Sequence, residues 1–99
     1  MNVIDNKEES RFETKVDGHD AFIEYSMLPG VLSLNHTEVD KALSGQGVAS
    51  EMTEKTLMQI EQRGLKVIPE CGFIKNYIDK HPEWKSILAD DQKKKPSQD

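Results

Sequence analysis

The spacing of apolar residues changes once along this chain of 99 residues, and that change limits the folds available to it. Residues 11–16 and 21–27 alternate apolar and polar side chains, as strands with one buried face do. From residue 48 to residue 63 the apolar side chains instead recur at the spacing of one helix face. The pattern therefore predicts strands first and a helix packed on them afterwards.

Turn signals define the arrangement of the first strands. Asp17-Gly18 and Pro29-Gly30 are pairs that tight turns favour, and a third strand is predicted at 31–39. Connections this short join neighbouring antiparallel strands. We therefore expect the first three strands to form an antiparallel meander.

The second half of the chain predicts a parallel pair. A short apolar segment at 65–71 follows the helix, which Gly64 is placed to end. Because this segment comes after a strand and a helix, we expect it to pair parallel to 31–39 through a right-handed crossover. A second helix begins the segment 72–84 and is closed by Pro82.

The predicted element order is β-β-β-α-β-α. It describes an α/β fold, a three-layer sandwich on a small mixed sheet that is antiparallel first and parallel later. We assign 11–86 to one domain, 1–10 to a flexible N-terminus and 87–99 to a flexible polar tail.

The composition argues against several classes of partner. The net charge is −5, and the one dense basic run, 93–95, lies in the polar tail, so we expect no nucleic-acid binding. No apolar run approaches the roughly 20 residues of a membrane span, and the first ten residues lack the pattern of a signal peptide. Cys71 is the single cysteine and cannot form an internal disulfide. We therefore expect a cytoplasmic protein with no membrane partner.

The segment SGQGVAS, residues 44–50, places two glycines one residue apart at the start of the predicted helix. A helix start offers N–H groups without intrahelical partners and the positive end of a dipole, and both favour an anion. Gly45 and Gly47 lack a Cβ, so the backbone there can turn sharply and approach a phosphate. The same residues also suit a plain tight connection with Ser44 as the helix cap. The local sequence leaves both interpretations open.

Three short motifs of this chain can be compared with those of a known protein family. They are HTEV at 36–39, GQGVAS at 45–50 and IPECGF at 68–73. In this order and spacing they resemble the small single-domain group within the GNAT superfamily of N-acetyltransferases, and the resemblance covers residues 11–86. It implies a GNAT-like fold and acetyl-coenzyme A as co-substrate.

The resemblance also implies how the cofactor lies. The superfamily loop reads Gln/Arg-x-x-Gly-x-Gly/Ala; Gly47 and Ala49 match it, and Ser44 departs from it at the first place. The backbone of this loop would hold the pyrophosphate, and the pantetheine arm would lie beside residues 36–39. The cofactor-binding residues that this implies are His36, Thr37, Val39, Gly45, Gln46, Gly47, Val48, Ala49 and Ser50. Which side chains of 36–39 point inward is left open.

Cys71 and Tyr77 are the catalytic candidates. Cys71 ends the second parallel strand, and from the residues alone it is a proton donor, a nucleophile or a small buried hydrophobe. The resemblance favours a catalytic role for Cys71, and for Tyr77 it implies protonation of the coenzyme thiolate, with core packing as the alternative. His36 is either a base or a half-buried strand residue, and Glu38 and Glu70 are further candidates to deprotonate an amine through water.

We therefore expect an acetyl-coenzyme A-dependent N-acetyltransferase with an unknown amine acceptor, acting as a monomer or a weak homodimer. One alternative is a non-catalytic module that binds coenzyme A or an acyl form of it, and another is an interaction domain without a ligand. His19 and His81 do not combine with Cys71 in a metal-ligand spacing, so we expect no metal.

Overall fold

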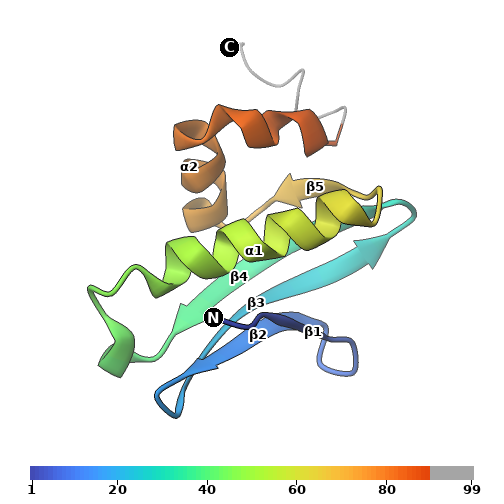
Figure 1. Ribbon diagram of the computed structural model, residues 1–99. Coiled ribbons are helices and arrows are strands. Elements are labelled where there is room, and N and C mark those ends of the chain that lie inside the picture. Colours follow the sequence, from blue (N-terminus) through green and yellow to red (C-terminus); the bar gives the residue numbers. More distant parts are fainter. Residues whose placement is uncertain (90–99) are drawn as a thin grey trace.

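A computed structural model describes residues 1–89 of the chain as a five-stranded sheet with two α-helices (Figure 1). The strand order in the sheet follows the chain, β1-β2-β3-β4-β5. The elements are β1 (Ile4–Asn6), β2 (Arg11–Val16), β3 (His19–Leu28), β4 (Val31–Val39), the 3₁₀ helix η1 (Lys41–Leu43), α1 (Val48–Gln62), β5 (Lys66–Pro69), α2 (Gly72–Lys80) and the 3₁₀ helix η2 (Pro82–Ile87).

The pairing confirms the mixed sheet. Strands β1 to β4 are antiparallel neighbours, and β5 pairs parallel to β4 after the chain has passed through α1. Asp17 and Gly18 both have positive φ angles, 52° and 81°, which is the geometry of the two-residue hairpin turn that matches strand twist. The predicted antiparallel meander is therefore confirmed, with its turn residues where the sequence placed them.

Helix α1 packs on one face of the sheet. Met52, Leu57 and Ile60 lie along its buried side, and they share one core with strand residues such as Phe12 and Ile23. All of these side chains are inaccessible to solvent. The period change in the sequence thus corresponds to one helix lying across strands β2 to β5 (Figure 1).

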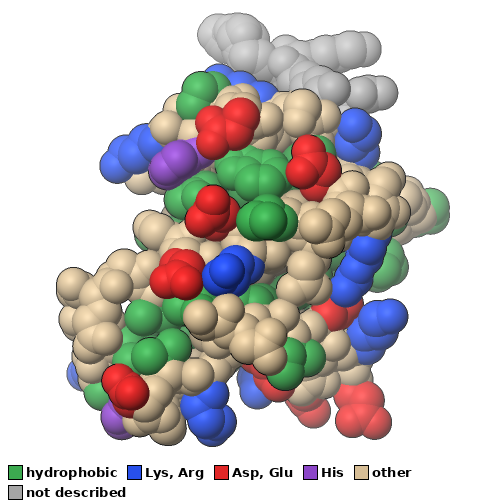
Figure 2. Space-filling model, viewed as in Figure 1, with side chains coloured by type: hydrophobic (Ala, Val, Ile, Leu, Met, Phe, Trp, Pro, Cys, Tyr) green, Lys and Arg blue, Asp and Glu red, His purple; other side chains and the backbone are tan. Residues whose placement is uncertain are grey.

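The chain after β5 stays attached to the core for longer than expected. Pro82 does end α2, as predicted, but it also begins η2, because a proline suits a first helical position that needs no N–H partner. Trp84 and Ile87 of η2 are buried, and Leu88 forms a bridge with Val67 of β5. Apolar side chains gather where α2 and η2 meet α1 (Figure 2). Residues 87–89 are therefore ordered; the rest of the predicted tail, 90–99, lies outside the described residues.

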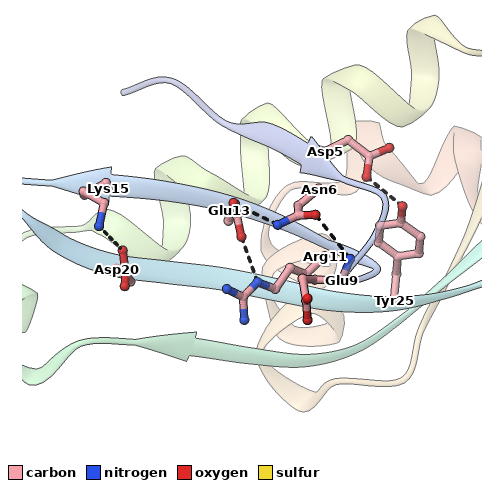
Figure 3. A network of polar contacts seen from close by, with 8 residues as sticks. All are labelled: Asp5, Asn6, Glu9, Arg11, Glu13, Lys15, Asp20 and Tyr25. Atoms are coloured by element: carbon pink, nitrogen blue, oxygen red, sulfur yellow. Dashed lines mark hydrogen bonds and ion pairs between the residues drawn. The ribbon is translucent and has the colours of Figure 1, made fainter.

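The N-terminal segment is the other correction. Residues 1–10 were expected to be flexible, yet they contain β1, which pairs with β2, and Val3 is buried in the core. The Asp5 side chain is 6% exposed and accepts a hydrogen bond from Tyr25 Oη at 2.6 Å (Figure 3) and another from Arg63 at 2.8 Å. A three-residue strand is too short to show a period, so no pattern of apolar residues indicates it.

Asp5 connects three elements and is the polar anchor of β1. It joins β1 to Tyr25 of β3 and to Arg63 at the end of α1. Burial, together with the hydrogen bond to Asp5 and its charge, raises the pKa of Tyr25 to about 12. The phenol therefore stays protonated and donates to Asp5 throughout the neutral range.

We expect Asp5→Ala to lower the free energy of unfolding by about 2–3 kcal/mol, because it leaves the Tyr25 hydroxyl without its charged acceptor. The matched control is Asp20→Ala, since Asp20 pairs with Lys15 at 2.9 Å but both side chains are more than 60% exposed (Figure 3). Exposed ion pairs contribute little to stability, so Asp20→Ala should lower the free energy of unfolding much less than Asp5→Ala does. Urea unfolding measures both, and equal losses would show that β1 is not anchored through Asp5.

Candidate active site

Strand β4 is longer than the neighbour it pairs with in parallel. Strand β5 pairs only with Val31–Leu34, and the last contact is a hydrogen bond from the Cys71 N–H to the Leu34 carbonyl at 2.9 Å. Beyond the pair of Leu34 and Pro69 the ladder stops, and the Glu70 N–H bonds back to the Ile68 carbonyl at 3.1 Å. From residue 35 to residue 39, β4 has a strand partner only on its β3 side within the part of the chain that the structure describes. This free edge can pair with an extended ligand.

A β-bulge lies at the point where β4 and β5 separate. Tyr25 pairs with Leu34 and the preceding residue of β3, Glu24, pairs with His36, so Asn35 is the extra residue on β4. A bulge bends its strand and increases the local twist. The bulge therefore lies where it can turn the second half of β4 away from β5 and open the gap between the two strands.

The register settles which side chains of 36–39 face inward. Thr37 pairs with Ile23, and Val39 pairs with Ala21; both partners are core residues of β3, and Val39 itself packs against the core. His36 and Glu38 lie on the opposite, outer face of the sheet, where both are exposed. The HTEV motif thus presents its two small or apolar side chains to the core and its two titratable side chains to solvent.

The glycine loop has the conformation that its two glycines permit. Gly45 and Gly47 have φ angles of 76° and 74°, a left-handed conformation that other residues rarely adopt. Gly47 is the N-cap of α1 and brings no side chain to cap it, and the Glu51 N–H is the first to bond within the helix, to the Gly47 carbonyl at 3.1 Å. The N–H groups of residues 48–50 therefore remain available, as at any uncapped helix start.

Side chains of the loop leave this helix start open. A Cβ added at Gly45 or Gly47 would meet no protein atom within 4 Å, so the space beside both is open to a ligand. The Gln46 side chain turns back and donates to the Ala42 carbonyl at 3.3 Å. Ser44 ends η1 through its own N–H and does not cap α1, which removes the role that the plain-turn interpretation gave it. The residues present therefore fit a phosphate group held by backbone N–H groups.

Cys71 occupies the N-cap position of α2, at the other side of the gap. Its half-buried Sγ lies 3.3 Å from Oγ1 of Thr37. Burial works to raise the pKa of this thiol, but hydrogen bonds from Thr37 and from the backbone N–H groups of Ile74 and Phe73 outweigh it, so the pKa is lowered. The thiolate form of Cys71 is therefore more stable than that of a cysteine in an ordinary, solvated environment.

The contact between Thr37 and Cys71 is the feature that the sequence did not indicate. Thr37 was predicted only as a cofactor-binding residue, and 34 positions separate it from Cys71. The two meet because β4 and β5 are neighbours and because only Glu70 separates Cys71 from the end of β5. Only the strand register could have shown that these two side chains lie together.

Tyr77 lies in the core of the α2 region. It is 8% exposed, and its ring stacks on that of His81 with centroids 4.1 Å apart. Burial, with smaller contributions from Glu54 and Glu83, raises the pKa of its hydroxyl. Tyr77 shares a helix with Cys71, and its role in protonating a thiolate stays a prediction.

We expect Thr37→Val to raise the pKa of Cys71, because the variant removes the hydroxyl that can donate to the thiolate. Alkylation of the thiol by iodoacetamide at neutral pH should then slow by roughly three- to tenfold. Thr37→Ser keeps the hydroxyl and should react close to the wild-type rate. If both variants react alike, the hydrogen bond does not control this thiol.

No helix within residues 1–89 has the length and apolar character needed to cross a membrane. Over the same residues, no three histidine, cysteine, aspartate or glutamate side chains converge in a way that could hold a metal ion.

Comparisons with known proteins agree with this geometry. Protein NATD1 of Mus musculus is 26% identical over 85 residues, which cover 83% of this chain and 77% of NATD1. The NMR solution structure of a GCN5-like protein from Staphylococcus aureus superimposes with a TM-score of 0.66 at 22% identity, covering 89% of this chain and 87% of that one, and shows the same fold. The model of the family described as GCN5-related N-acetyl-transferase matches residues 11–87. The chain therefore belongs to the GCN5-related N-acetyltransferase family.

Proposed function

We propose that this protein transfers the acetyl group of acetyl-coenzyme A to an amine. The observation that carries the proposal is a set of three features on β4 and on the segments that follow it. They are the free edge of β4 at residues 35–39, the uncapped start of α1 at Gly47, and the Cys71 thiol at the start of α2. Family membership supports the choice of cofactor.

The backbone of the loop is the proposed phosphate site. The N–H groups of Gly47 and residues 48–50 would hold the pyrophosphate, and the dipole of the 15-residue helix α1 would favour its negative charge. The free edge of β4 would pair with the amide-bearing pantetheine arm, as strand edges pair with extended peptides. The site uses backbone groups for most of this binding, which is why the departure at Ser44 is compatible with it.

Cys71 is the proposed proton donor. Bound acetyl-coenzyme A would supply an acetyl thioester, whose carbon–sulfur bond breaks during transfer. A thiol with a lowered pKa, as Cys71 has, gives up its proton more readily than an ordinary cysteine. Sγ of Cys71 would deliver that proton to the departing sulfur, and Thr37 and the α2 N–H groups would stabilise the thiolate that remains.

We expect Gly47→Glu to abolish acetyl-coenzyme A binding, because it adds bulk and negative charge where the pyrophosphate would lie. Gly64→Glu is the matched control: Gly64 has nearly the same φ angle, 72° against 74°, but follows the other end of α1. Both variants carry the same backbone strain, and only the first should lose binding in titration calorimetry. Normal binding by Gly47→Glu would place the phosphate site elsewhere.

We expect Cys71→Ala to bind acetyl-coenzyme A normally and to lose about tenfold or more of its turnover. Calorimetry measures the binding, and release of coenzyme A thiol in the presence of a panel of amines measures the turnover. Unchanged turnover would remove Cys71 from the chemistry. Binding without turnover in the wild-type protein itself would identify the alternative, a coenzyme A-binding module.

A further inference from the structure

A histidine–carboxylate pair lies on the part of β4 that extends beyond β5. Nε2 of His36 is 2.7 Å from Oε1 of Glu38, and the two side chains are 55% and 58% exposed. Exposed pairs of this kind usually contribute little to stability. The pair borders the free edge of β4, where the proposed co-substrate would bind.

The hydrogen bond determines which nitrogen of His36 can act as a base. An ionised carboxylate only accepts hydrogen bonds, so Nε2 must carry the hydrogen that it shares with Glu38. In the neutral ring, the lone pair then lies on Nδ1. Glu38 therefore holds the tautomer in which Nδ1 of His36 is free to take a proton.

An acceptor can reach the free edge of β4 more easily from the outer face of the sheet, which carries this pair. The inner face is filled: Thr37 contacts Cys71, Val39 packs against the core, and α1 covers the strands. On the outer face, the exposed carboxylate of Glu24 stands opposite His36 in the strand register. An acceptor amine, which is a cation before it reacts, would thus approach between two carboxylates, Glu24 and Glu38.

The other charged groups of the outer face are mostly engaged with one another. Arg11, the register partner of Glu24 on β2, bonds Glu13 at 2.8 Å and lies over the Phe22 ring. Glu13 also accepts a hydrogen bond from Asn6 (Figure 3). His36 is therefore the side chain of this face that combines a free basic nitrogen with a place at the open edge of β4.

We propose that His36 is the general base of the reaction and that Glu38 is its positioning residue, an inference that rests on the proposed acetyl transfer. Nδ1 of His36 takes a proton from the ammonium group of the acceptor, which leaves a neutral amine. The amine nitrogen forms a bond to the acetyl carbon and the carbon–sulfur bond breaks. The sulfur leaves with the proton from Cys71, and the second amine proton passes to solvent, so that charge and atoms balance.

The experiment compares His36→Ala, Glu38→Gln and His19→Ala with the wild-type protein. His19→Ala is the matched control, because His19 also sits on a strand and faces a carboxylate, Asp40, at 3.5 Å. For each protein, calorimetry gives the acetyl-coenzyme A affinity. Steady-state kinetics then give kcat for the amine that the wild type acetylates fastest among polyamines, arylalkylamines and lysine peptides.

We expect His36→Ala to keep its cofactor affinity and to lose about tenfold or more in kcat, as removal of a general base does. Added imidazole should restore part of this loss and should not accelerate the wild type or His19→Ala. Glu38→Gln should lose a few-fold, because the amide still accepts from Nε2 but no longer stabilises the protonated ring.

Two results would overturn the proposal while leaving the acetyltransferase function standing. One is an unchanged kcat in His36→Ala, and the other is a loss that imidazole does not restore. A wild-type protein that binds acetyl-coenzyme A but acetylates no amine would overturn both proposals together.

Discussion

The early end of the β4–β5 ladder is the constraint on which the candidate site depends. The Glu70 N–H bonds back to the Ile68 carbonyl instead of to β4, and the Asn35 bulge lies where β4 leaves its neighbour. If the two strands stayed paired to Val39, the edge of β4 would be occupied. A backbone turn at Glu70 and one extra residue in β4 thus lie where an otherwise continuous sheet opens.

The candidate site would allow an acidic chain to accept a polyanion. With a net charge of −5, the protein has no general attraction for phosphates. At the proposed phosphate site, local backbone groups would have to supply the attraction, and two left-handed glycines leave the N–H groups at the start of α1 accessible without placing a side chain over them. The same logic applies at the start of α2, whose N–H groups help to lower the pKa of Cys71.

The fold could be predicted from the sequence wherever its signal was periodic. The alternation in β2 and β3, the helical spacing of α1 and the turn glycines were each strong, and the structure confirms the antiparallel and parallel halves that they predict. The structure departs from expectation at the two ends. Strand β1 has only three residues, and its stability comes from Asp5 and Val3, whose partners lie in β3, α1 and the core. Residues 87–88 are buried because η2 folds back onto β5.

For the candidate site, the amino-acid sequence alone indicates the components: the HTEV segment, a glycine pair before a helix, and a cysteine after a strand. The glycine pair is a local feature, since glycine permits positive φ wherever it occurs. That Thr37 contacts Cys71 while His36 and Glu38 face the other side of the sheet follows from the tertiary structure alone. The physical reason is that side chains alternate along a strand, so a single bulge changes which of them face the core, and strand register is set by long-range packing rather than by neighbouring residues.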